Sequence, residues 1–439
     1  MKKGTADILK RVGWVGLCIA GLCVLFASLS GLANRPLRRA YAALEADGRP
    51  MDPAQIIPPP IPDADNAAPI YQAAALQLKT EPGGEELGAL AARMLEDESD
   101  AEAEEAFRAL CARPFVQDAI EMLRKGSRRA GCRYDIDYSM GWETLLPHIG
   151  ELRNLSRIIC GKARLSVAQG LQEEAWDDAI TSLRLANALQ NEPALISQLV
   201  RMAQFSLAVN AIRFVAARGA PNPQQYDETT RLLLTFEDIA PLVLALDGER
   251  LMLGEWAFDQ PPSELKKIFG DEQSIPVAFY SYFPPLRQHD RAAYLSTMHA
   301  YANNAIAPYS PCDTDLDEQL LNDVPRHFML TRLLAPPLSA VKGRFVIMIA
   351  QARVTRVGLA AIRFKQDQGA FPPDLQALEL ADTDDPFTGK PLIYRATDHD
   401  FTIYSVGKNL SDNGGTESKD PRSGDIVWRF EKHTQAGQL

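Results

Sequence analysis

Residues 163–193, ARLSVAQGLQEEAWDDAITSLRLANALQNEP, contain the clearest structural pattern in the chain. A first apolar segment ends near Gly170, a residue that favours helix termini. The second segment begins with acidic residues at positions 173, 174, 177 and 178, which complement the partial positive charge of a helix N-terminus. Apolar residues then recur at spacings of three and four, as on one face of a helix. The stretch therefore predicts a helical hairpin.

The second helix of this hairpin resembles half of a tetratricopeptide repeat, because Ala179, Leu183 and Ala186 have the small and large side chains of that family at the right offsets. An ordinary helical hairpin explains the same pattern, since no second copy follows at a period of about 34 residues. The surrounding residues 66–335 have a helical period and are interrupted by Pro and Gly. We expect a mainly α protein with a bundle or solenoid-like body over 66–335.

Composition limits the classes of function. The chain has 439 residues, of which 46% are hydrophobic and 23% charged, values that exclude a disordered, collagenous or multi-span membrane protein. The formal net charge is -11, although the first 33 residues carry four basic side chains and one acidic side chain. The remainder is therefore strongly acidic. We expect no nucleic-acid partner, because nucleic-acid binding requires clustered Lys and Arg.

The N-terminal region predicts a membrane anchor. Residues 12–33 contain no charged side chain, and a helix of this length spans about 33 Å, enough for the hydrocarbon core. We expect a cytoplasmic tail over 1–11, one transmembrane helix over 12–33 and the body outside the cytoplasm, in the periplasm of a bacterial cell. The alternative is a cleaved signal peptide, since Gly31–Ala33 has the small-x-small form of a cleavage site.

Residues 34–65 are predicted to connect this anchor to the body. Residues 36–46 have an amphipathic helical pattern, and Gly48 is expected to end that helix. Seven prolines then occur between residues 50 and 69. Such a segment favours an extended, semi-rigid spacer that holds the body away from the bilayer.

Residues 336–439 are predicted to form a small α+β domain. Apolar residues from Val346 to Phe364 recur at spacings of three and four, and the helix is expected to stop at Gly369. Short alternating segments at 392–394, 401–406 and 425–430 predict strands, with Phe401 and Ile403 on one face. One long helix on a small antiparallel sheet would bury both apolar surfaces.

Four motifs of this domain occur in the order IRFKQDQGAFPPDLQAL (362–378), DPFTGKPLIYR (385–395), FTIYSVGKNLSDNGG (401–415) and GDIVWRF (424–430). Together they resemble the globular head of the major pseudopilin of type II secretion systems, over residues 345–430. In that family the membrane helix runs directly into the head, whereas here the predicted span lies more than 300 residues upstream. The resemblance therefore implies a pilin-like head on a tethered protein that is not processed and polymerised.

The same resemblance implies a calcium site in the loop after the YSVG motif. The matching positions are Asn409, the carbonyl of Leu410, Asp412 and Asp425. Calcium takes six to eight oxygen ligands, and Asn409 stands where the family usually has Asp, which lowers the charge. The alternative is a plain polar hairpin, because SDNGG is a strong turn sequence.

Two further groups of residues leave alternatives open. Four cysteines of the body either form disulfides or serve as buried thiols; they are Cys111, Cys132, Cys160 and Cys312. Aromatic residues between 255 and 312 form either part of a core or an exposed docking patch.

Catalytic signatures are absent from the sequence. HExxH, GxSxG, Walker A and GxGxxG patterns do not occur, so no catalytic residue is predicted. We expect a non-catalytic structural or interaction protein of the inner membrane that binds other envelope proteins, in a setting related to secretion. The alternatives are an envelope hydrolase with its site in the helical body and a calcium-responsive sensor.

Overall fold

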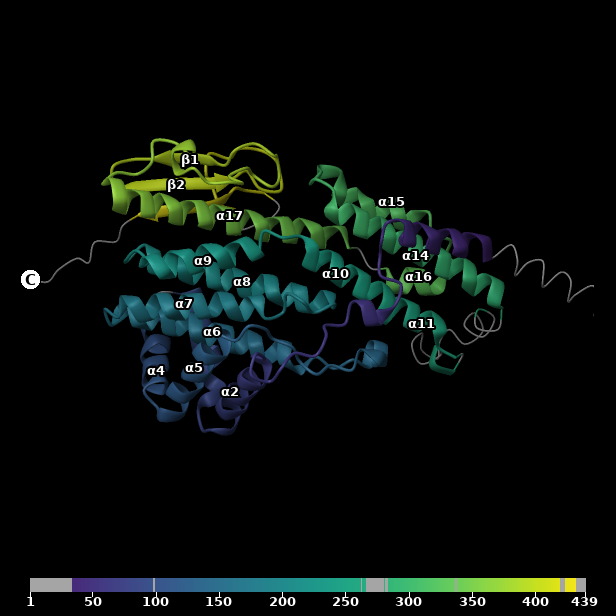
Figure 1. Cartoon of the computed structure of the whole chain (residues 1–439), viewed down its shortest axis with the longest axis horizontal. Coiled ribbons are helices and arrows are strands. Elements are labelled where there is room, and N and C mark those ends of the chain that lie inside the picture. Colours follow the sequence, from purple (N-terminus) through teal and green to yellow (C-terminus); the bar gives the residue numbers. More distant parts are fainter. Residues whose placement is uncertain are drawn as a thin grey trace, which may run out of the picture. The chain divides into compact units, whose positions relative to one another are not determined.

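The computed structural model describes residues 34–97, 99–261, 263–265, 280, 283–335, 338–418 and 423–431, apart from the side chains of Trp142 and Thr314. The predicted tail and span over 1–33 lie outside the described residues. The described architecture is mainly helical with one small antiparallel sheet, which confirms the predicted fold class (Figure 1). Contacts divide the chain into two compact units.

The smaller unit comprises Met1–Gln55, Glu249–Ala302 and Asp317–Leu338. Its described helices, two of which extend into the neighbouring segments of the chain, are the helix over 34–46, η1 (Pro53–Gln55), the π-helix η3 (Glu249–Glu255), α11 (Trp256–Asp259), α14 (Pro284–Ile306), α15 (Leu316–Asn322) and α16 (Met329–Leu334). Phe258 and Tyr280 are buried in this unit, in agreement with the core alternative for these aromatics. Phe279 and Tyr282 lie outside the described residues.

Gly48 ends the first described helix, as predicted. Its φ is +66°, a left-handed conformation that glycine adopts without steric cost. The Gly48 amide donates to the Glu45 carbonyl at 3.0 Å, and the Arg49 amide donates to the Leu44 carbonyl at 2.9 Å. These two bonds form a Schellman motif, which satisfies the last carbonyls of the helix.

The larger unit comprises Ile56–Gly248, Asn303–Leu316 and Ser339–Leu439. Its main helices are α2 (Ala68–Thr80), α3 (Gly84–Glu96), α4 (Ala101–Cys111), α5 (Pro114–Ser127), α6 (Pro147–Ala168), α7 (Gln172–Asn187), α8 (Leu195–Ala216), α9 (Pro223–Thr235), α10 (Ala240–Gly248) and α17 (Ser339–Gln368), with short 3-10 turns η2 (Tyr138–Glu143), η5 (Pro311–Asp315) and η6 (Gln376–Leu378). Prolines start α5, α6 and α9, where a missing amide costs no hydrogen bond. These prolines, which interrupt the helical pattern of the sequence, therefore lie at the starts of helices in the structure.

Helices α6 and α7 form the predicted hairpin, with Gly170 between them at a φ of +74°. Trp176 of α7 is buried, and its indole N–H donates to the Gly219 carbonyl at 2.9 Å after α8. Helix α8 packs against α6 and α7, and α9 packs against α7, so that α5 to α9 form a layered helical array (Figure 1). This array is the part of the predicted helical body around the hairpin, whereas residues 249–302 and 317–335 of the predicted range belong to the smaller unit.

The segment predicted as a spacer is held against this body at its C-terminal end. The Arg133 guanidinium donates from Nε to the Pro58 carbonyl at 2.8 Å. The Asn66 side chain donates to the Arg133 carbonyl at 2.9 Å and accepts from the Arg133 amide at 2.9 Å. Pro58 and Asn66, at the two ends of residues 58–66, are therefore both bonded to Arg133 of the helical body.

The C-terminal helix and sheet pack as predicted. Strands β1 (Ile393–Ala396), β2 (Asp400–Ser405) and β3 (Ile426–Glu431) are antiparallel in the order β1-β2-β3. The β2–β3 register pairs Phe401 with Phe430 and Ile403 with Trp428, and all four side chains are buried. Helix α17 lies against β2 and β3, and ends at Gly369 with a φ of +81°.

The opposite side of α17 packs against α8 and α9 (Figure 1). Arg213 of α8 donates to the Val427 carbonyl at 3.0 Å and to the Thr355 hydroxyl at 2.9 Å. Glu237, after α9, pairs with Arg353 and Arg356 of α17. The C-terminal sheet and α17 are therefore bound to the helical array through buried and half-buried charges as well as apolar contacts.

Two apolar segments among the described residues are long enough to cross a membrane, namely α8 and Met329–Gln368. Half of the most apolar stretch of α8, and 83% of that of the second segment, is buried inside the protein. Core packing accounts for both. The four cysteines named above are free thiols, and Cys111 and Cys160 are buried, as expected for thiols that act as small apolar residues.

Candidate functional site

The residues predicted to bind calcium lie in or beside one loop, and their side chains bond backbone amides of that loop and the side chains of Tyr404 and Asn413. Both carboxylate oxygens of Asp425 accept backbone amides, from Asn413 at 3.2 Å, Gly415 at 2.7 Å and Thr416 at 3.2 Å. Asp425 is buried, so these bonds lie out of water. This carboxylate therefore holds residues 413–416 of the loop against the start of β3.

The remaining predicted ligands are engaged in a similar way. One oxygen of Asp412 accepts the Tyr404 hydroxyl at 2.9 Å and the Gly414 amide at 2.8 Å, and these bonds lower the pKa of Asp412. Asn409 accepts the Ser411 amide at 3.1 Å, and Leu410 has a left-handed φ of +56°. Within the ranges described above, no cluster of three His, Cys, Asp or Glu side chains suits a metal ion. In this conformation the donor set forms the polar hairpin, and a calcium ion, which takes six to eight oxygens, would compete with the amides for the Asp425 carboxylate. The calcium site stays a prediction.

We expect the Asp425→Asn variant of the full chain to unfold more easily, by about 2 kcal/mol, because an amide presents an NH2 group to donors that need a charged acceptor. Thermal unfolding of wild type and variant in chelator and in millimolar calcium checks this. Calcium should leave the wild-type midpoint unchanged. Asp398→Asn, an exposed carboxylate in the same domain, is the control. A clear rise of the wild-type midpoint in calcium would contradict the expectation.

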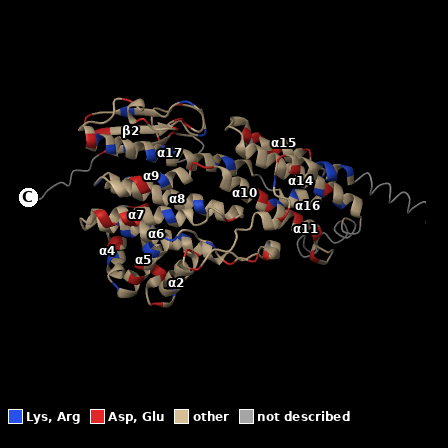
Figure 2. Ribbon diagram, in the orientation of Figure 1, with Lys and Arg blue, Asp and Glu red and all other residues tan. Residues whose placement is uncertain are grey.

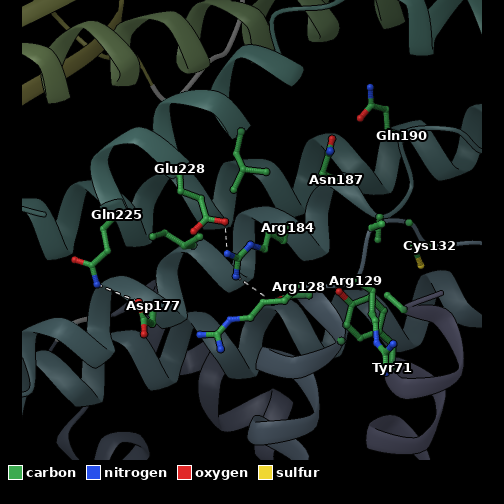
Figure 3. Close-up of a pocket in the computed structure, with 18 of the residues that line it drawn as sticks. Tyr71, Arg128, Arg129, Cys132, Asp177, Arg184, Asn187, Gln190, Gln225 and Glu228 are labelled. Atoms are coloured by element: carbon green, nitrogen blue, oxygen red, sulfur yellow. Dashed lines mark hydrogen bonds and ion pairs between the residues drawn. The ribbon is translucent and has the colours of Figure 1, made fainter. Parts of the chain in front are cut away.

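A second candidate site lies in the helical body. A groove of about 860 Å³ runs between the C-terminal end of α5, the start and end of α7, the loop after α7, and α9 (Figure 3). Its lining is mostly polar. It is built by segments that are far apart in the sequence, and it belongs entirely to the larger unit.

The α7–α9 side of the groove is a network of charges and amides. Arg184 of α7 forms an ion pair with Glu228 of α9, and its second nitrogen lies 3.3 Å from the Ser127 hydroxyl of α5. Gln225 donates to the Asp177 carboxylate at 3.0 Å (Figure 3). The capping box of Asn222 and Gln225 fixes the start of α9 at this position. These contacts hold the two walls at a set separation.

The rim of the groove carries side chains without such partners. Arg128 and Arg129, directly after α5, are exposed and pair with no carboxylate in the part of the chain that the structure describes. The side-chain amides of Gln190, Asn191 and Gln224 likewise make no hydrogen bond to described residues. An amide offers both donors and acceptors, so these groups suit a polar ligand.

One end of the groove contains Tyr71 and Cys132 (Figure 3). Burial, together with the nearby Glu192 carboxylate, raises the pKa of the Cys132 thiol to about 12. The thiol is therefore protonated at neutral pH, whereas a nucleophilic cysteine requires the thiolate. Behind it, His148 is buried at 2% exposure, bonded to Glu192 at 2.8 Å and stacked on Tyr134. This end is built as a polar core and lacks an activated nucleophile.

Sequence reasoning did not find the groove. Two signals were available, namely consecutive arginines at a helix end and runs of Asn and Gln at 187–191 and 222–225. Neither signal indicates a groove in the sequence alone, because the groove forms only where α5, α7 and α9 lie side by side in the folded chain. No protein-family model, no curated protein and no solved structure matches the chain.

Proposed function

We propose that this protein is a membrane-anchored, non-catalytic interaction protein of the cell envelope whose helical body binds an extended segment of a partner protein in the polar groove. The proposal rests on the polar groove. Its walls are held together by the Arg184–Glu228 and Gln225–Asp177 contacts, and three side-chain amides on its rim make no hydrogen bond to described residues. An extended polypeptide presents alternating backbone N–H and C=O groups. The amides of Gln190, Asn191 and Gln224 have the chemistry to bond both.

The membrane setting rests on the uncharged residues 12–33, and the secretion-related setting rests on the resemblance of residues 345–430 to a pseudopilin head. The packing of α17 supports a tethered role. Both sides of this helix are in contact with other elements, since β2 and β3 lie on one side and α8 and α9 on the other. A helix covered in this way has no free face for packing in a filament.

A peptide library displayed on phage, selected on the full chain in detergent micelles, tests the binding function. We expect enriched peptides that bind the wild type and lose affinity at least about tenfold when Gln224→Trp fills the groove, since a bulky ring replaces the space for the ligand. Glu105→Trp, at an exposed position of α4 outside the groove, should leave the affinity unchanged. Failure of any peptide to enrich, or equal binding to Gln224→Trp, would refute the proposal.

A further inference from the structure

The two rim arginines are basic groups of the groove that have no carboxylate partner among the described residues. Arg128 and Arg129 follow Ser127, the last residue of α5, and both are exposed. Figure 3 shows the Arg128 side chain reaching along the groove below Arg184, and Arg129 beside Tyr71. Arg184 itself is paired with Glu228. The guanidinium groups of these two consecutive residues thus lie at separate places on the groove rim, and neither has a carboxylate partner among the described residues.

A purely structural role for these arginines is the stabilisation of the helix C-terminus, where positive charge is favourable. That role is already filled, because Arg124 and Lys125 lie in the last turn of α5. Arg124 pairs with Asp178 at 2.8 Å, and Lys125 with Glu121 at 3.6 Å. The charges of Arg128 and Arg129 are additional to those that the helix end needs.

The acidic residues of the groove do not neutralise the rim. Glu228 is paired with Arg184, and Asp177 accepts the Gln225 amide. Glu173 lies in the first turn of α7, where the helix N-terminus favours a carboxylate. Acidic and basic side chains both occur along the helices of this unit (Figure 2), and the chain beyond residue 33 is acidic overall. Selectivity by charge must therefore come from groups inside the groove.

We propose that Arg128 and Arg129 make the groove selective for partner segments that carry Asp or Glu side chains. This inference rests on the proposed function and adds the chemistry of the partner. Guanidinium groups bind carboxylates with two parallel hydrogen bonds, a geometry that lysine cannot offer. The backbone of the segment would be bound by the rim amides, and its carboxylates by the two arginines.

The test is the charge composition of the phage pool selected on three forms of the full chain. Wild type should enrich Asp and Glu above their frequency in the starting library. Arg128→Glu/Arg129→Glu should lose this bias and enrich Lys and Arg. Arg153→Glu/Arg231→Glu is the matched control, because it reverses two exposed arginines of α6 and α9 that line no described pocket and should keep the acidic bias.

The affinity of a single enriched peptide then measures how much its acidic side chains contribute to binding. Replacing its Asp and Glu by Asn and Gln should weaken binding to wild type about tenfold, and higher salt should weaken the acidic peptide more than the amide peptide. Enrichment that depends on the groove but shows no acidic bias, or an acidic bias that survives Arg128→Glu/Arg129→Glu, would overturn this inference alone. A pool with no enrichment at all would overturn the proposed function.

Discussion

Replacing Glu237 by Gln is expected to lower the free energy of unfolding by about 3–5 kcal/mol, because it breaks a buried ion-pair network from one side. Glu237 accepts from the Nε of Arg353 at 2.8 Å and from the Nε of Arg356 at 2.7 Å. Its side chain is 8% exposed and that of Arg356 is 4% exposed. The neutral amide would leave two guanidinium groups with little access to water and without a counter-charge.

Urea unfolding of the full chain, followed by circular dichroism, measures this loss. Glu105→Gln removes an exposed carboxylate of α4 and should change stability by no more than a few tenths of a kcal/mol. The double variant Glu237→Gln/Arg356→Gln should lose less stability than the sum of the two single variants. The reason is that the second change removes the Arg356 charge, which Glu237→Gln alone leaves without a counter-charge. A loss below about 1 kcal/mol for Glu237→Gln would show that the pair is solvated and does not hold α17 to the array.

The Asp290→Ala variant is expected to lose about 3 kcal/mol and to loosen α16 in the smaller unit. The fully buried carboxylate of Asp290 accepts the Leu330 amide at 3.0 Å, the Thr331 amide at 3.1 Å and the Tyr280 hydroxyl at 2.6 Å. Alanine would leave these donors buried without an acceptor. The two amides lie at the first turn of α16, so this side chain acts as a cap supplied from another helix.

Hydrogen exchange of the peptide covering residues 329–335 in the full chain reports on this cap directly. Exchange should accelerate in Asp290→Ala and remain at the wild-type rate in Asp323→Ala, an exposed carboxylate of the same unit. Burial raises the pKa of Asp290, so the folded protein keeps the proton to a higher pH than the unfolded chain. The contribution of this group to stability therefore falls as pH rises above about 3.8 toward the raised pKa, and Asp290→Asn should remove that part of the slope. Unchanged exchange in Asp290→Ala would contradict the capping role.

The sequence does not predict the conformation of the loop that contains the proposed calcium ligands. Asn409 and Asp412 lie in the segment between β2 and β3, and Asp425 directly precedes β3. Whether their oxygens face a shared centre or the backbone depends on the conformation of residues 413–416. Those residues turn three amides toward Asp425, a detail of φ and ψ that side-chain types do not encode.

The sequence by itself determined the local structure of this protein. Helix period, proline at helix starts and glycine at helix ends specify α5 to α9 and α17, because each signal acts within a few residues of the chain. Alternation in the last strands likewise placed Phe401 and Ile403 on the face that α17 covers.

Only the tertiary structure decided which of these elements meet. The groove joins Arg128 after α5, Arg184 of α7 and Glu228 of α9. Glu237 meets Arg356 at a separation of 119 positions. Such pairings depend on how the apolar faces of whole helices pack, and many packings satisfy the same periodic pattern. The sequence therefore shows which residues are charged. Their ion-pair partners, their burial and their accessibility to a ligand are determined only by the folded structure.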